Sequence, residues 1–260
     1  MSTGDVSAED LRRFSDALAG ISARQGWFER SLRAAIRGWC RVVAWHIAVE
    51  GVEHLPVRDG VPGAGCVVAA APHRAWVEPF LLVAAWPADA ARLVWLADGR
   101  TVTRSWWRRR LPPRLGIIPI ASASGGPQAY AELVSLACAS GHAVVVFPEI
   151  GPPAPSDRTR RISPGFAYLA LRAGAPVVPI VLGGTHHIVR GSSYSVDILP
   201  ALEPGSTLDD PFVSAGRARA HALTRELQDK VAEVLPERTA QADAAAPSRD
   251  RWTWLATLLG

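Results

Sequence analysis

The sequence has no long run of uncharged apolar residues, although 48% of its 260 residues are hydrophobic. A helix needs about 20 such residues in a row to cross a bilayer, so no membrane-spanning helix is expected. The first twenty residues include acidic residues and no compact apolar block, and we therefore expect no cleavable signal peptide. Binding to a membrane surface stays open on these grounds.

Cysteine and lysine are scarce. Cys40, Cys66 and Cys138 are odd in number, far apart and without a CxxC pair, which predicts buried free thiols in a reducing compartment. Lys230 is the only lysine, so the net charge of +4 comes from arginine. Arginine favours phosphate or anionic membrane surfaces as partners. An Ala/Arg-rich, Lys-poor composition is equally typical of a GC-rich genome, so composition does not decide between the two causes.

Short apolar runs alternate with helical patterns through the middle of the chain. The runs predict five buried strands, at Cys66–Ala71, Arg92–Ala97, Leu115–Ile120, Ala143–Phe147 and Pro176–Leu182. The helical patterns are at Pro79–Trp86, Pro127–Ser140, Gly165–Ala173 and Ser214–Leu235. This alternation predicts an α/β fold with a largely parallel central sheet flanked by helices. The alternating segment Ser195–Leu202 is expected at an edge of the sheet.

The segment from Trp27 to Val49 predicts a basic amphipathic helix. Its apolar residues recur at steps of three and four, and between them lie Arg30, Arg33, Arg37 and Arg41. Such a helix lies on an anionic membrane with its arginines toward the headgroups. A helix docked on the domain gives the same pattern, so both interpretations stay open.

The absence of internal repeats and of a long central linker favours one principal domain with terminal extensions. We divide the chain into an N-terminal helical, membrane-associating segment (1–47), an α/β domain (48–235), and a linker with an apolar tail (236–260). The linker is expected from Pro236 to Asp250, and the tail ends in RWTWLATLLG. No nucleic-acid-binding module is recognisable, and the tryptophan-rich segments fit lipid better, so no nucleic-acid partner is expected.

The stretch AAAPHRAWVEPF places His73 in a loop after a predicted strand and Glu78 at the start of a predicted helix. In α/β folds, ligands bind at the carboxyl ends of strands, in loops of this kind. A carboxylate on one imidazole nitrogen makes the other nitrogen a better base. Glu78 at a helix start also interacts favourably with the helix dipole. From this stretch alone, a catalytic pair and a structural one are both open.

Four segments, PHRAWVE, LGIIPIAS, VVVFPEIG and PVVPIVL, follow one another in an order typical of glycerolipid acyltransferases. The chain thereby resembles the lysophosphatidic acid acyltransferase (PlsC-type) family. The blocks of that family are an NHxxxxD motif, a strand ending in arginine, an FPEG(T)R motif and a PvvPv strand. The resemblance covers residues 48–184 and implies a glycerol-3-phosphate acyltransferase-like fold.

The resemblance implies transfer of a fatty acyl group from acyl-CoA or acyl carrier protein to a hydroxyl of a lysophospholipid or related lipid acceptor. No further cofactor and no metal are implied. His73 matches the general base, Glu78 matches its orienting carboxylate in a variant HxxxxE motif, and Glu149 matches the acceptor-binding glutamate. The phosphate-binding arginine is expected among three candidates, Arg158 first and then Arg160 and Arg161.

The sequence departs from the family pattern at four places. Pro72 replaces the asparagine before the histidine, and Glu78 replaces an aspartate but still has the length to reach the imidazole. Ser122 stands where the second block carries arginine, and a Pro-rich insertion after Gly151 separates the third block from its arginine. The acceptor site thus departs more than the catalytic pair, and the arginine-rich segment at 104–114 is another source of positive charge.

Two other functions stay open. The altered second and third blocks also fit a catalytically silent relative that binds lipid or acyl carrier, and a thioesterase-like hydrolase would use His73 to deliver water. No GxSxG motif is present, so a serine nucleophile of that type is not expected. For each of these functions, acyl transfer included, we expect peripheral attachment to the cytoplasmic face of the cell membrane.

His186 and His187 are adjacent, in the sequence GGTHHIV. Neighbouring residues on a strand point to opposite faces, so a metal ion shared by the two is not expected.

Overall fold

The structure is a computed structural model of the chain, and it describes residues 16, 22–23, 25–98, 116–120, 126–205 and 214–246. Three features of the sequence lie outside these ranges: the arginine-rich segment at 104–114, Ser122 and the C-terminal tail. None of the helices within the ranges is both long and apolar enough to cross a membrane.

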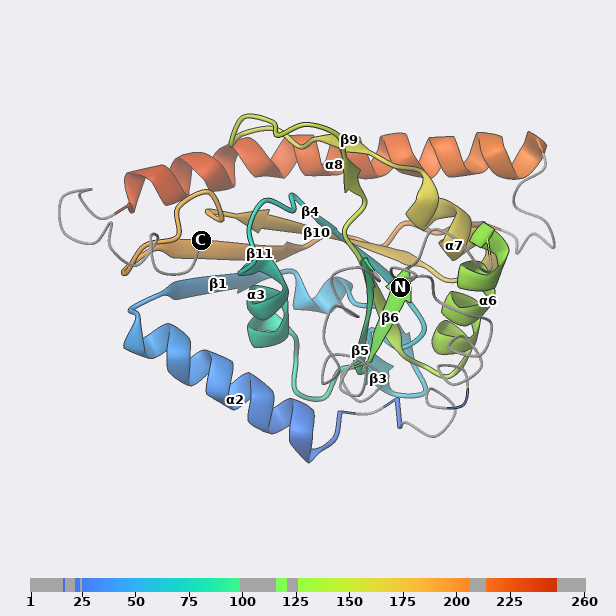
Figure 1. Cartoon of the computed structure of the whole chain (residues 1–260), viewed down its shortest axis with the longest axis horizontal. Coiled ribbons are helices and arrows are strands. Elements are labelled where there is room, and N and C mark those ends of the chain that lie inside the picture. The colour runs from blue at the N-terminus through green and yellow to red at the C-terminus, as the bar shows by residue number, and fades with distance from the viewer. Residues whose placement is uncertain are drawn as a thin grey trace, which may run out of the picture.

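A seven-stranded sheet of order β1-β11-β10-β4-β7-β5-β6 lies at the centre (Figure 1). Its strands are β1 (His46–Glu50), β4 (Val67–Ala71), β5 (Leu93–Asp98), β6 (Ile117–Ile120), β7 (Ala143–Val146), β10 (Val177–Gly183) and β11 (Ser193–Ile198). Every neighbouring pair is parallel except β10 and β11. The predicted α/β fold with a largely parallel sheet is therefore confirmed.

The described residues also form helices and two short antiparallel ribbons. The helices are α2 (Trp27–Val42), the 3₁₀ turn η1 (Val52–His54), α3 (Glu78–Ala85), α6 (Gly126–Ala139), α7 (Gly165–Ala173) and α8 (Ser214–Ala244). The ribbons pair β2 (Val57–Arg58) with β3 (Val61–Pro62), and β8 (Glu149–Ile150) with β9 (Arg161–Ile162).

The predicted edge strand is wrong, because β11 lies between β10 and β1. The strand at this edge of the sheet is β1, which comes from the end of the segment predicted as one helix to Val49. That helix ends at Val42, and Ala44 then takes a left-handed conformation. The side chains of β1 alternate between exposed and half-buried, which is the period of a strand, and its pairing with β11 overrides the helical pattern of the sequence.

Helix α8 continues to Ala244, nine residues beyond its predicted end at Leu235. The predicted linker is thus wrong over residues 236–244. The buried stripe of α8, formed by Leu227, Val231 and Leu235, extends on to Thr239 at the helical spacing of four residues. Pro236 is exposed on the opposite face, so packing of the stripe outweighs the helix-breaking tendency of this proline.

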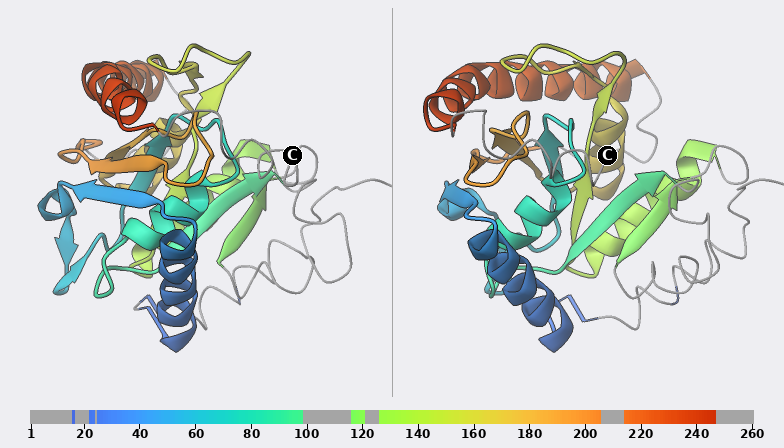
Figure 2. Two further views of the ribbon diagram at one scale, coloured as in Figure 1. Left: turned by 90° about the vertical axis from the view of Figure 1, so that its left-hand side faces the viewer. Right: turned by 60° about the vertical axis from the view of Figure 1, so that its left-hand side comes forward.

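Helices cover both faces of the sheet (Figure 2). Every residue of β4 is fully buried, and its side chains alternate between two hydrophobic cores. Val67, Ala69 and Ala71 pack with α6, α7 and α8, whereas Val68 and Ala70 pack with α3. A strand buried on both faces explains why its sequence is continuously apolar rather than alternating.

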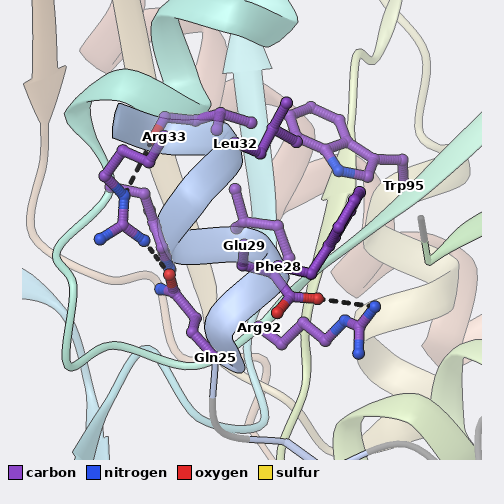
Figure 3. A pocket seen from close by; sticks show the side chains of 10 residues that line it. Gln25, Phe28, Glu29, Leu32, Arg33, Arg92 and Trp95 are labelled. Atoms are coloured by element: carbon purple, nitrogen blue, oxygen red, sulfur yellow. Dashed lines mark hydrogen bonds and ion pairs between the residues drawn. The ribbon is translucent and has the colours of Figure 1, made fainter. Parts of the chain in front are cut away.

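Helix α2 docks on α3 and β5 around a cavity of about 50 Å³ (Figure 3). Glu29 forms an ion pair with Arg92 at 2.7 Å. Arg33 and Arg37 donate from Nε to the carbonyl oxygens of Val83 and Ala84 at 3.3 and 2.8 Å, at the end of α3. These two arginines therefore satisfy the last carbonyl groups of α3 and do not face lipid headgroups.

The opposite side of α2 is uncovered. Trp27, Trp39 and Val42 are exposed, and Trp39 lies beside Trp76 and Phe80 in the lining of an apolar groove. One side of the amphipathic helix is thus docked on the domain, and the other presents aromatic side chains to the solvent.

Candidate active site

His73 and Phe147 come together because they follow neighbouring parallel strands. Strand β4 ends at Ala71 and β7 ends at Val146, with Ala69 paired to Val146. The carboxyl ends of parallel strands meet at the same edge of a sheet. The two rings stack there with centroids 4.1 Å apart and planes inclined by 22°. The first and third sequence blocks therefore belong to one site.

Glu78 organises the loop that carries His73. Its Oε2 lies 2.6 Å from Nδ1 of His73. The backbone N–H of Arg74 donates to both carboxylate oxygens, at 2.8 and 2.9 Å, and that of Ala75 donates to Oε1 at 3.0 Å. The carboxylate is fully buried, and these donors replace the water that it loses.

The contact with Glu78 fixes both the orientation and the tautomer of the imidazole. An ionised carboxylate only accepts hydrogen bonds, so Nδ1 of His73 carries the hydrogen and Nε2 keeps its lone pair. Nε2 makes no hydrogen bond to the described residues, and 43% of the side chain is exposed. Glu78 thus closes the loop and orients the imidazole of His73, and the catalytic role of the pair stays a prediction.

Glu149 connects the loops of the first and third sequence blocks by hydrogen bonds. Its Oε2 accepts a hydrogen bond from the backbone N–H of His73 and its Oε1 one from that of Arg160, both at 2.9 Å. The side chain is 1% exposed. Both oxygens are thus buried and each accepts one backbone hydrogen bond, which gives Glu149 a positioning role. The acceptor-binding role that the resemblance implies stays a prediction.

Among the three candidate arginines, Arg160 lies nearest to this unit. Its Nε is 4.0 Å from Oε2 of Glu149, and this nitrogen is buried without a hydrogen-bond partner in the described part of the chain. Arg158 and Arg161 have exposed side chains. The first choice from the sequence, Arg158, enters the network through its carbonyl oxygen, which accepts a hydrogen bond from the guanidinium of Arg74.

Phe147 and Arg74 are site residues that the sequence interpretation did not single out. Phe147 is the last residue of a predicted buried strand, so the same rule that placed His73 at the strand ends indicates it too. Arg74 gives no signal of its own, since it is simply the neighbour of His73. Burial lowers the pKa of Arg74, while the nearby carboxylates of Glu149 and Glu78 favour its charged form.

The cysteines do not supply a nucleophile. All three are buried and free, as predicted. Burial raises the pKa of Cys138 to about 12 and that of Cys66 further still, so both thiols stay protonated at neutral pH. The one group of three metal-ligating side chains in the described ranges, around His186, does not include His73.

Comparisons with known proteins bear on the family and the fold. The model of the Acyltransferase family matches residues 46–183. A solved structure, the 1-acyl-sn-glycerophosphate (LPA) acyltransferase PlsC from Thermotoga maritima, is similar with a TM-score of 0.55 at 18% sequence identity. The similarity covers 80% of this chain and 79% of that chain. A comparison with curated protein sequences found no match.

The network around Glu78 predicts a loss of stability for Glu78→Gln. The NH₂ group of the glutamine amide faces the backbone N–H of Arg74 in either orientation, because this N–H donates to both carboxylate oxygens in wild type. A buried donor is then left unsatisfied, and the free energy of unfolding should fall by about 1 to 3 kcal/mol. Urea unfolding of the variant, compared with wild type, measures this change.

The matched control is Glu226→Gln, which makes the same chemical change at an exposed position of α8. It should alter the free energy of unfolding by less than about 0.5 kcal/mol. Equal stability of the Glu78→Gln variant and wild type would contradict the hydrogen-bond network.

Proposed function

Because the chain belongs to the Acyltransferase family, we propose that it transfers a fatty acyl group to a hydroxyl of a lysophospholipid or related lipid acceptor, with His73 as general base. The donor is the thioester of acyl-CoA or acyl carrier protein. One observation carries the proposal: Nδ1 of His73 is bound to a buried carboxylate while Nε2 is free among the described residues and exposed.

The reaction needs one proton carrier. Nε2 of His73 takes the proton of the acceptor hydroxyl as the oxygen attacks the thioester carbonyl carbon, and Glu78 stabilises the imidazolium that forms. The tetrahedral intermediate then collapses with cleavage of the C–S bond. The thiolate leaves and receives the proton from the imidazolium, which restores the neutral base. The acyl group never bonds to the enzyme, so the buried cysteines are not required.

The acceptor headgroup is proposed to bind beside Glu149. Arg160 supports this, because its guanidinium lies beside Glu149 and its Nε makes no hydrogen bond to the described residues. Arg74 adds a second guanidinium to the same region. A planar guanidinium binds phosphate oxygens in pairs, which suits a phosphate headgroup such as that in the name of the Thermotoga maritima protein. Arg158 and Arg161 are exposed on this loop, and phosphate binding by either of them stays a prediction.

The groove between α2 and α3 is proposed to receive the acyl chain of a lipid at the membrane surface. It has a volume of about 430 Å³ and an almost entirely apolar lining that includes Trp39, Trp76 and Phe80. The lining includes Trp76 from the loop that carries His73, and Phe80 from the first turn of α3. Between 45% and 49% of each of these three aromatic residues is exposed. Exposed aromatic residues of this kind suit a peripheral protein on the cytoplasmic face of the cell membrane.

Replacing His73 by alanine is expected to lower the rate of acyl transfer about 10²- to 10⁴-fold, because the general base is lost. The assay supplies labelled acyl-CoA or acyl carrier protein together with total lipid extract, and it follows both the labelled lipid product and the released thiol. His221→Ala is the control, since His221 is exposed on α8, and this variant should keep full activity.

The same assay separates the three functions. Labelled lipid formed by wild type supports transfer, and undiminished transfer by the His73→Ala variant would contradict the mechanism. Thiol release without a labelled lipid product would show a hydrolase. Binding of vesicles without thiol release, across all donors and acceptors offered, would show a catalytically silent relative.

The aromatic groove predicts how the protein binds vesicles. The double variant Trp39→Ser/Phe80→Ser should partition about tenfold more weakly onto anionic phospholipid vesicles, because it removes apolar surface that would insert between the lipids. Vesicle co-sedimentation measures this partition. Val57→Gln, which removes an exposed apolar residue outside the groove lining, should bind as wild type does. Equal binding by the double variant and wild type would exclude the groove as the membrane-facing surface.

A further inference from the structure

His186 and His187 both contact Asp243, which lies in the last turn of α8. Their Nε2 atoms are 2.8 and 2.9 Å from the same carboxylate oxygen, Oδ1. The prediction that the two imidazoles point to opposite faces is therefore wrong. Strand β10 ends at Gly183, and the histidines lie in the turn that follows, where the alternation of a strand no longer applies.

Two glycines allow this turn to approach α8. A Cβ atom on Gly183 would lie 2.7 Å from Cβ of Arg238, and one on Gly184 would lie 3.1 Å from Cβ of Ala242. Gly184 also has a φ of +80°, which other residues rarely adopt. The sequence GGTHH thus combines a close backbone approach to the helix with two imidazoles directed at its last turn.

We propose that His186, His187 and Asp243 form a binding site for a divalent transition-metal ion of the zinc class. Two imidazole nitrogens and one carboxylate oxygen are ligands that zinc prefers, and the three ligand atoms lie within 4.8 Å of one another. Water completes a tetrahedral coordination on the exposed side. The proposal does not depend on the acyltransferase reaction.

The surroundings favour a cation at this position. The carboxylate of Asp243 faces both imidazoles with the same oxygen, and half of its side chain is exposed. Asp243 lies at the carboxyl end of α8, where the helix dipole is negative. The neighbouring positive charge of Arg238 is paired with Asp197 and Glu50.

A small movement converts the hydrogen-bonded arrangement into a coordinating one. Ligand atoms of a tetrahedral zinc ion are about 3.3 Å apart, given Zn–N and Zn–O distances of about 2.0 to 2.1 Å. The carboxylate of Asp243 therefore has to retreat by about 0.5 Å from both imidazoles, and its side chain is 50% exposed. The two imidazole nitrogens, which lie within 4.8 Å of each other, have to come to a similar separation.

Bound metal would cross-link the end of α8 to the connection between β10 and β11. Thr239, one turn before Asp243, donates a hydrogen bond to the carbonyl oxygen of Ser156 at 3.1 Å. Ser156 belongs to the Pro-rich loop that also carries Arg158 and Arg160. The site would thus stabilise the fold at a position that also supports this loop.

Zinc titration of the full chain, after removal of metal with a chelator, tests the proposal. Competition against a chromophoric zinc chelator should reveal one tight equivalent per chain. At a free zinc concentration 100 times the dissociation constant, the melting temperature should rise by about 5 to 10 °C. Failure of wild type to bind one equivalent, or to gain stability from zinc, would overturn the proposal.

Two variants locate the site. His186→Gln and Asp243→Asn should each weaken zinc binding at least tenfold. Loss of a side chain that binds the metal directly lowers the affinity at least as much as loss of a residue that only hydrogen-bonds to such a ligand. The matched controls are His221→Gln and Asp229→Asn, which change exposed residues of α8 and should bind zinc as wild type does. Unchanged affinity in both site variants, or an equal loss in the controls, would overturn the assignment.

Discussion

The site depends on a single buried carboxylate. Glu78 lies between a strand and a helix with no exposed surface, and burial of an ionised carboxyl group is costly unless donors replace its water. The available donors are two backbone N–H groups of the loop and Nδ1 of His73. Satisfying Glu78 therefore shapes the loop, orients the imidazole and selects its tautomer together, so the structural role of this residue and its proposed catalytic role have the same origin.

A second carboxylate extends this arrangement to the neighbouring strand. Because β4 and β7 are parallel neighbours, the residues that follow them meet, and Glu149 links the backbone of His73 to that of Arg160. Phe147 completes the unit by stacking on the imidazole. The side chains proposed to recognise an acceptor are thus held by the same loops that hold His73, and the insertion after Gly151 lengthens one of these loops.

The sequence predicts the parts of the fold that burial alone determines. The five central strands are continuously apolar, and the structure places each within two residues of its predicted bounds. The errors occur where tertiary contacts override a local pattern. Strand β1 continues a helical periodicity but pairs with β11, and α8 continues through Pro236 because its buried stripe does.

For the site, the pair of His73 and Glu78 is predictable because strand ends and a helix start place the two residues together. The choice among the arginines is not, since spacing alone cannot tell which of Arg158, Arg160 and Arg161 folds back from a Pro-rich loop. The contact of His186 and His187 with Asp243 could not be predicted from the sequence either. Helix α8 was expected to end before Asp243, and the close approach of the turn to this helix depends on two glycines.

The central claim is that Glu78 holds His73 as the tautomer whose Nε2 accepts a proton. Nitrogen-15 NMR of the histidine side chains, with the His73 signals assigned by comparison with the His73→Ala variant, tests it directly. At a pH where the imidazole is neutral, the account predicts a hydrogen on Nδ1 and an unprotonated Nε2. A hydrogen on Nε2 of the neutral ring would contradict it.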